Sequence, residues 1–203
     1  LNIGGPARHA VLLTEGLDKS RFDSFLVCGK VSSGEGDMIY YAQEKGVKPY
    51  FIPELQREIS FFKDIAALKK IINIIKIEKP DIIHTHTAKA GTLGRIAGIL
   101  YNLFNCRCRK RVKLIHTFHG HVFHSYFSPL KSRLIIFIER ILALFTDRII
   151  TVSQSLLEEI VHKYHIAPRA KVVAIPLGLD LPDPLLTKRL AGNLKRELGL
   201  PEE

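Results

Sequence analysis

The stretch "PDIIHTHTAKAGTLGRIAGILYNLF", residues 80–104, joins a strand pattern directly to a helix pattern. Pro80 ends the apolar helical pattern that precedes it, and residues 81–87 then have the character of a short buried strand. Residues 90–104 follow with helical spacing and many small side chains, which permit close packing. A buried strand followed by a helix is the repeating unit of a parallel α/β sheet.

The same alternation runs along the rest of the chain. Strands are predicted at 22–29, 47–53, 112–118, 147–153 and 171–178, and helices at 59–78, 129–145 and 155–164. Pro49 favours an edge position for the strand at 47–53. Ser155 and Glu158 match a capping box at the start of the last helix. The pattern predicts an α/β fold, a Rossmann-like parallel sheet with helices on both faces.

The first residues, "LNIGGPARHA", place Gly4 and Gly5 before a helix that is led by proline. Glycines at a helix N-terminus let a ligand phosphate approach backbone N–H groups at the positive end of the helix dipole. Such a turn normally follows a strand, but only Leu1–Ile3 precede it. We therefore expect that the first strand of the sheet is missing and that the chain is a fragment.

The composition limits the class of protein and its partners. Thirty Lys and Arg against 20 Asp and Glu give a net charge of +10, which attracts nucleic acid, anionic lipid or phosphorylated substrates. The densest basic run is Arg107–Lys113. The chain has 3 cysteines and no paired C-x-x-C, which favours reduced thiols in a cytoplasmic protein.

The segment "HTFHGHVFHSYFS", residues 116–128, contains His116, His119, His121 and His124. Ligands of such sheets bind beyond the carboxyl ends of the strands, so this segment is expected to line the site. His86 and Ser153 end the neighbouring strands and should reach the same rim.

Zinc is the competing interpretation of these histidines. The chain lacks H-E-x-x-H, and we expect neither a metal nor another cofactor. His84 is predicted to be a hydrogen-bonded core residue. Solvated positions are predicted for His9, His162 and His165.

Five motifs, in this order, point to a family: "NIGGPARH", "DIIHTHTAKAGTLGR", "HTFHGHVFHSYFS", "ERILALFTDRIITVSQSL" and "IPLGLD". Together they resemble the N-terminal domain of a family 4 retaining glycosyltransferase with the GT-B fold, of the bacterial polysaccharide or cell-surface glycan type. The resemblance implies that residues 1–182 form a Rossmann-like acceptor-side domain. Residues 183–203 would then be a helix or linker leading to an absent donor-binding C-terminal domain.

The resemblance also implies roles for individual residues. Gly4 and Gly5 would face the donor phosphates, and His119 would be the catalytic histidine near the transferred sugar. The acceptor side of the cleft would be lined by His86, Lys89, Gly120, His121, His124 and Ser153. Leu177 stands where the family usually has asparagine, so no polar role carries over to that position.

The activity that the resemblance implies is transfer of a sugar, with retention, from a nucleotide-sugar donor to a lipid-linked glycan acceptor. The fragment alone is expected to be inactive, because the donor-binding groups would come mostly from the absent domain. Two alternatives remain open at this stage: a basic nucleic-acid-binding α/β domain and a nucleotide-sugar epimerase of similar architecture. Lysines and arginines are spread through the helices without an RNA-binding signature, so no nucleic-acid partner is expected.

The helical segment 133–145 is apolar on almost every side, and two interpretations compete for it. It is either sandwiched in the core or carries an apolar flank onto a membrane surface. The sequence favours burial. Basic residues nearby are nevertheless compatible with a cytoplasmic protein that attaches peripherally to anionic lipid on the inner face of the cytoplasmic membrane.

Overall fold

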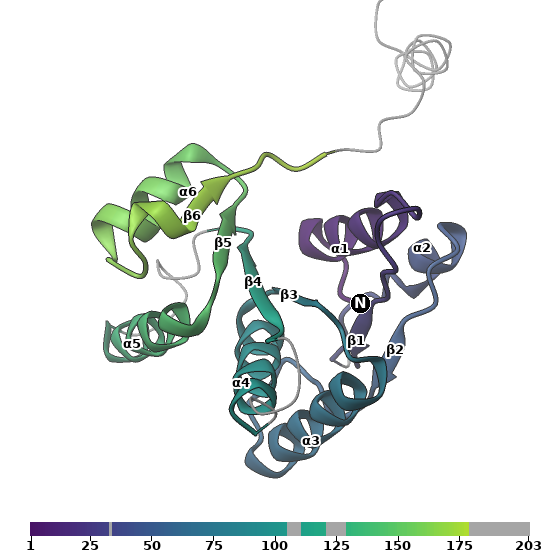
Figure 1. The fold of residues 1–203 in the computed structure, drawn as a ribbon. Coiled ribbons are helices and arrows are strands. Elements are labelled where there is room, and N and C mark those ends of the chain that lie inside the picture. Colours follow the sequence, from purple (N-terminus) through teal and green to yellow (C-terminus); the bar gives the residue numbers. More distant parts are fainter. Residues whose placement is uncertain (33, 105–110, 121–128, 179–203) are drawn as a thin grey trace, which may run out of the picture.

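The computed structural model describes residues 1–32, 34–104, 111–120 and 129–178 (Figure 1). In chain order the helices and strands are α1 (Gly5–Gly16), β1 (Val27–Gly29), α2 (Ile39–Glu44), β2 (Tyr50–Ile52), α3 (Phe61–Glu78), β3 (Ile82–His86), α4 (Ala88–Phe104), β4 (Lys113–Phe118), α5 (Pro129–Phe145), β5 (Arg148–Thr151), α6 (Gln154–Glu158) and β6 (Val172–Ala174). A π-helix, Glu159–Lys163, continues α6, and a 3₁₀ turn, Arg169–Lys171, precedes β6. The alternating α/β order predicted from the sequence is confirmed.

The described strands form two parallel sheets. One contains β1 and β2, and the other has the order β3-β4-β5-β6. In the larger sheet His86 of β3 lies opposite Thr117 of β4, and Phe118 lies opposite Thr151 of β5. The carboxyl ends of β3, β4 and β5 therefore meet along one edge, where ligands of such sheets bind.

Three glycines bring α4 close to the larger sheet. A Cβ atom at Gly91, Gly94 or Gly98 would lie within 2.8 Å of the His116, Thr85 or Leu114 side chain, respectively. The spacing of three and four residues puts all three glycines on one face of the helix. The small residues noted in the sequence thus allow α4 to lie directly on β3 and β4.

A buried ion pair joins α4 to α5. Arg95 and Glu139 are both buried, and their side chains are 2.8 Å apart. Arg95 Nε also donates to the carbonyl of Gly91 at 3.0 Å. Figure 1 shows α3, α4 and α5 side by side along one side of the molecule. The Arg95–Glu139 ion pair fixes α5 to α4 within this row of helices.

Three local expectations need correction. Only the last three residues of the predicted strand 22–29 form β1. Ser153, and not Ser155, is the N-cap of α6, because the Ser153 hydroxyl accepts a hydrogen bond from the Leu156 amide. The short helix α2 carries no N-terminal side-chain cap and was not predicted. The predicted helix or linker at 183–203 lies outside the described residues.

In the part of the chain that the structure describes, no helix is both long and apolar enough to cross a membrane.

Candidate active site

Four histidines meet at the carboxyl edge of the larger sheet. His84 and His86 share one face of β3, His119 directly follows β4, and His9 reaches them from α1. The ring centroids of His9 and His86 are 5.4 Å apart, and those of His9 and His119 are 5.2 Å apart. His86 Nδ1 lies 3.0 Å from His119 Nε2, within hydrogen-bonding distance. The parallel register places His86 and His119 together, because both end neighbouring strands.

Burial keeps these imidazoles neutral. It lowers the pKa of His86 to about 2 and the pKa values of His84 and His119 to about 4, and the neighbouring histidines add to each shift. Burial also lowers the pKa of His9. A neutral imidazole has one N–H donor and one acceptor nitrogen, which suits it to bind sugar hydroxyls that both donate and accept.

Two ring nitrogens of the cluster are buried without a hydrogen-bond partner among the described residues: Nδ1 of His9 and Nδ1 of His119. Buried polar atoms are nearly always satisfied in native proteins, so a polar ligand or water is expected there. His84 is different, because its Nε2 lies 2.7 Å from the Thr117 hydroxyl. The prediction that His84 is hydrogen-bonded is confirmed, although its side chain is half-buried and lies at the edge of the core.

The histidines of segment 116–128 do not form one group. His116 is buried in the sheet, with its Nδ1 2.9 Å from the Thr85 hydroxyl and its ring beneath Gly91. His119 alone joins the cluster, while His121 and His124 lie outside the described residues. Among the described residues, the group that offers three nitrogens within 4.8 Å of one another, an arrangement that could hold a metal ion, is instead His9, His86 and His119.

The glycine turn belongs to the same site. Gly4, the N-cap of α1, has φ +156°, a conformation that only glycine adopts readily. A Cβ atom at Gly5 would meet nothing within 4 Å, so the backbone there is open to a ligand. His9 lies one turn further along α1 and contacts the cluster. The N-terminus of α1 is thus held next to the carboxyl ends of β3 and β4 (Figure 1).

Comparison with known proteins assigns the family. A sequence model of Glycosyltransferase Family 4 matches residues 3–182. The chain belongs to glycosyltransferase family 4. The family resemblance inferred from the five motifs is confirmed.

One curated relative is 32% identical to this family 4 chain in an alignment of 203 positions, which covers 98% of the chain and 48% of the relative. It is the UDP-Gal:alpha-D-GlcNAc-diphosphoundecaprenol alpha-1,3-galactosyltransferase of Escherichia coli. The chain therefore spans about half the length of that relative.

Solved structures agree on the fold. A glycosyltransferase from Rickettsia africae matches with a TM-score of 0.63 and 18% identity, covering 99% of this chain and 48% of that one. A UDP-N-acetylglucosamine 2-epimerase from Rickettsia bellii matches with a TM-score of 0.53 and 14% identity, covering 98% and 50%. The Rossmann-like α/β fold is therefore confirmed, but these likenesses do not distinguish a transferase from an epimerase.

The other predicted site residues of this family 4 chain occupy varied positions. Lys89 lies in the first turn of α4 and not in a loop; its amine is 2.5 Å from Asp64 and also donates to the Glu58 carbonyl. Ser153 caps α6 at the end of β5. Gly120 follows His119, and a Cβ atom there would meet nothing within 4 Å. Gly120 therefore leaves space beside the histidine.

His9 was missed by the sequence analysis, which predicted it to be solvated. Its half-buried ring packs against His86 and His119. A usable signal was its spacing of four residues from Gly5, which puts it one turn below the glycine turn on the same helix.

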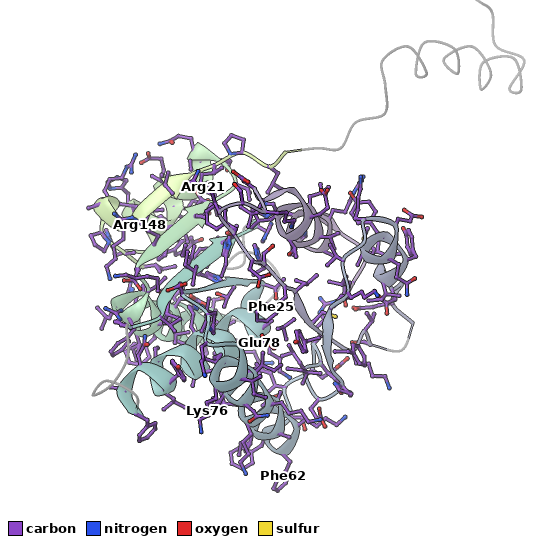
Figure 2. The ribbon with its side chains drawn as sticks, turned by 45° about the vertical axis from the view of Figure 1, so that its right-hand side comes forward. Arg21, Phe25, Phe62, Lys76, Glu78 and Arg148 are labelled. Carbon is purple, nitrogen blue, oxygen red and sulfur yellow. The ribbon has the colours of Figure 1, made fainter. Side chains whose placement is uncertain are left out.

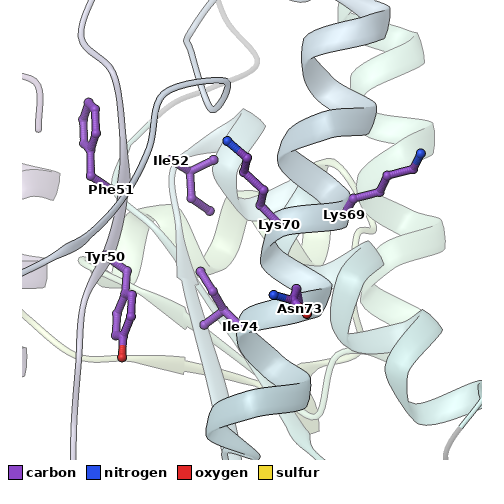
Figure 3. Close-up of a pocket in the computed structure, with 7 residues that line it drawn as sticks. All are labelled: Tyr50, Phe51, Ile52, Lys69, Lys70, Asn73 and Ile74. Carbon is purple, nitrogen blue, oxygen red and sulfur yellow. The ribbon is translucent and has the colours of Figure 1, made fainter.

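A hollow of about 350 Å³ lies elsewhere, between β2 and α3. Figure 3 shows Tyr50, Phe51 and Ile52 of β2 on one side and α3 on the other. Lys70, which also lines it, is held by Glu54 at 2.6 Å. The hollow shares no residue with the histidine cluster, and it contributes nothing to the chemistry described here.

Proposed function

We propose that this chain is the acceptor-side half of a retaining glycosyltransferase. The enzyme transfers a sugar from a nucleotide-sugar donor to a lipid-linked glycan in bacterial polysaccharide or cell-surface glycan synthesis. The observation that carries the proposal is the neutral histidine cluster held beside the glycine turn of α1. The E. coli relative, which acts on a diphosphoundecaprenol-linked sugar, supports the choice of acceptor.

The glycine turn serves the departing phosphate. Transfer from a nucleoside diphosphate sugar builds negative charge on the leaving phosphate, and fixed dipoles that point at this charge lower the barrier. The first backbone N–H groups of α1 have no partner within the helix, and the structure describes no acidic residue in its first turn. Gly4 and Gly5 let the phosphate approach these donors closely.

His119 is proposed to contact the transferred sugar. Its Nε2 is oriented by His86, which leaves Nδ1 as the atom available for a hydroxyl of the sugar ring. Because the imidazole is neutral, it can hold the ring by a hydrogen bond without introducing a charge that would oppose the developing positive charge at the anomeric carbon. The proposed acceptor side comprises His86, Lys89, Gly120, His121, His124 and Ser153.

The proposal includes no metal ion and no other cofactor, since helix N–H groups can stabilise the leaving phosphate. Metal analysis of the purified protein by mass spectrometry tests this. One equivalent of zinc that disappears in a His9→Asn, His119→Asn double variant would overturn the metal-free proposal. The control is His162→Asn, at an exposed histidine outside the cluster.

A chimaera tests the function. Residues 1–178 replace the corresponding half of the E. coli galactosyltransferase, and radiolabelled galactose transfer from UDP-galactose to GlcNAc-diphosphoundecaprenol is measured. Residues 1–203 alone are expected to be inactive, whereas the chimaera should transfer sugar to this or another lipid-linked acceptor. A folded chimaera that transfers to none of a panel of lipid-linked acceptors would contradict the proposal. Conversion of UDP-N-acetylglucosamine to its 2-epimer would support the epimerase alternative instead.

The proposed location is the cytoplasm, with peripheral attachment to the inner face of the cytoplasmic membrane, because an undecaprenol-linked acceptor is itself a membrane lipid. Nucleic acid is not among the proposed partners. Several basic side chains have protein partners, such as Lys70 with Glu54 and Lys113 with Asp147, and do not form a free basic stripe.

A further inference from the structure

Helix α5 carries a continuous apolar face that the described protein leaves uncovered. Its inner side is occupied by Glu139, Leu142 and Ala143, which are buried against the rest of the molecule. Its outer side exposes a line of large apolar residues: Leu130 (77% exposed), Leu134 (58%), Phe137 (58%), Ile141 (42%) and Leu144 (72%). The alternating spacing of four and three residues places them in one straight row along the helix. Single exposed apolar residues need no explanation, but a contiguous row indicates an interaction surface.

The charges around this row are all of one sign. The exposed charged side chains of α5 are Lys131, Arg133 and Arg140. Arg140 donates to the Tyr164 carbonyl, so Lys131 and Arg133 are the cations assigned to the margins of the row. The acidic residue of α5, Glu139, is buried and paired with Arg95. The outer face of α5 is therefore apolar in the middle and cationic at its margins. Such a face suits the boundary between the acyl chains and the anionic headgroups of a bilayer.

Residues 111 and 112 link the end of α4 to the end of α5. Asn102 holds Val112 through two hydrogen bonds, and Arg111 donates to the carbonyl of Phe145 at 3.3 Å. These contacts bring the C-terminal ends of α4 and α5 together. Each of these ends carries an exposed phenylalanine, Phe104 (84% exposed) on α4 and Phe145 (44%) on α5.

We propose that the outer face of α5 docks this protein onto an anionic lipid bilayer. The helix would lie in the membrane surface, with the row from Leu130 to Leu144 among the acyl chains and the basic residues among the phosphates. The exposure of the row corrects the sequence-based preference for a fully buried helix, and the docking proposal is built on this exposure. It deepens the proposed function, on which it depends only for the expectation that the acceptor is a membrane lipid.

The position of α5 in the chain connects the docking surface to the site. β4 ends beside His119 at the carboxyl edge of the sheet, and only residues 121–128 separate Gly120 from the start of α5. Leu130 and Leu134 therefore lie at the end of α5 that is nearest in sequence to the histidine cluster. In our proposal, a lipid-linked sugar leaves the bilayer beside this end of α5 and enters the site from there.

The protein has no tryptophan, which permits a direct test. Leu134→Trp and Phe62→Trp each introduce a single fluorescent reporter, one in the row and one on α3. Figure 2 shows Phe62 projecting from the end of α3, well away from Arg148, which follows α5. On addition of phosphatidylglycerol–phosphatidylethanolamine vesicles, emission from Leu134→Trp should shift to the blue, and emission from Phe62→Trp should not. Equal shifts in both variants, or none in either, would overturn the proposal.

Vesicle sedimentation provides the second measurement. The protein should bind anionic vesicles at least tenfold more strongly than phosphatidylcholine vesicles at low salt. The double variant Phe137→Ser, Ile141→Ser should reduce this binding about tenfold or more. The matched control is Phe61→Ser, Phe62→Ser, which removes two exposed phenylalanines from α3 and should bind as the unaltered protein does. Circular dichroism confirms that each variant is folded.

Other outcomes identify other occupants of the surface. A dimer in analytical ultracentrifugation that the α5 double variant dissociates, together with no vesicle binding, would show that a second copy covers the row and would overturn the membrane proposal. No donor or acceptor sugar is present in either experiment. Failure of vesicle binding is therefore distinguishable from failure of the transferase proposal, which the chimaera tests.

Discussion

The two sheets of this protein use their polar side chains in different ways. The four-stranded sheet and the helices packed on it bury several polar groups: His116 bonds to Thr85, and Arg95 of α4 pairs with Glu139 of α5. The two-stranded sheet buries few, and its polar contacts, such as Tyr50 with Glu78, are exposed. The larger sheet is thus a rigid frame, whereas the smaller one has an ordinary solvated surface.

The candidate site lies where these two regions meet. His86 and His119 come from the larger sheet, while His9 and the glycine turn come from α1, which packs with α2 in the smaller region. In the proposed function, one region provides groups for the sugar, and the other provides the backbone donors for phosphate. The proposed chemistry therefore depends on how firmly α1 is held against the larger sheet.

The largest effect is expected inside the rigid frame. Arg95→Ala leaves Glu139 buried without its partner, and breaking a buried ion pair typically costs about 3–5 kcal/mol of unfolding free energy. Urea denaturation measures this loss. The double variant Arg95→Met, Glu139→Leu should recover most of it, because both charges are then replaced by apolar groups. If Arg95→Ala unfolds at the wild-type urea concentration, the larger sheet is not the rigid region.

The next effect is catalytic and compares the two sides of the site. In the active chimaera, His119→Ala should lower turnover roughly a hundredfold or more, which is the usual scale for a positioned proton-transfer or charge-stabilising group. His124→Ala should affect turnover less and raise the acceptor KM more. Steady-state kinetics, with circular dichroism as a check on folding, makes the measurement.

His9→Ala tests the other side of the site, because it removes the histidine that α1 contributes. We expect a smaller loss of turnover than for His119→Ala. A folded His119→Ala enzyme with near-normal turnover would show that the catalytic assignment is wrong, and that the histidine is structural or contacts only the acceptor.

The third effect is a loss of stability in acid. Since the pKa of His86 is lowered from its unfolded value near 6.5 to about 2, the unfolded chain binds the proton first as the pH falls. The contribution of neutral His86 to the free energy of unfolding is fully present above pH 6.5 and is lost progressively as the pH falls below 6.5. At pH 5 the loss attributable to His86 is roughly 1–2 kcal/mol.

Urea denaturation at pH 7.5 and pH 5 measures this difference. His86→Gln should flatten the dependence on pH, and the exposed control His162→Gln should leave it unchanged. A His86→Gln protein that is as acid-sensitive as the wild type would show that the histidine cluster is more open to water than the structure indicates.

Particular residues show how far the sequence could predict this arrangement. The bounds of α5 were predicted correctly from Pro129 and the apolar run that follows, because helix boundaries are local properties. The exposure of its outer face was not predicted, since an apolar helix has the same sequence pattern whether both sides or one side is covered.

The site shows the same limit. The strand-end rule predicts from the sequence alone that His86 and His119 lie at one edge, because strand register follows from the fold. His9 could not be placed, since its neighbours depend on how α1 docks onto a distant part of the chain. His116 was grouped with His119 by proximity in sequence. In the structure, His116 lies within β4 and faces α4, whereas His119 follows β4 and faces the site.

The smallest effects should separate the two sheets most clearly. Tyr50→Phe removes an exposed hydrogen bond to Glu78 in the smaller region, and water replaces it at both partners, so the urea midpoint should not change measurably. Thr117→Val is the matched change in the larger sheet, where the fully buried Thr117 hydroxyl lies 2.7 Å from His84 Nε2. Leaving that nitrogen without its partner should cost about 1–2 kcal/mol. Equal responses to the two substitutions would mean that the polar contacts of the two sheets are energetically alike, and the contrast between frame and solvated surface would then fail.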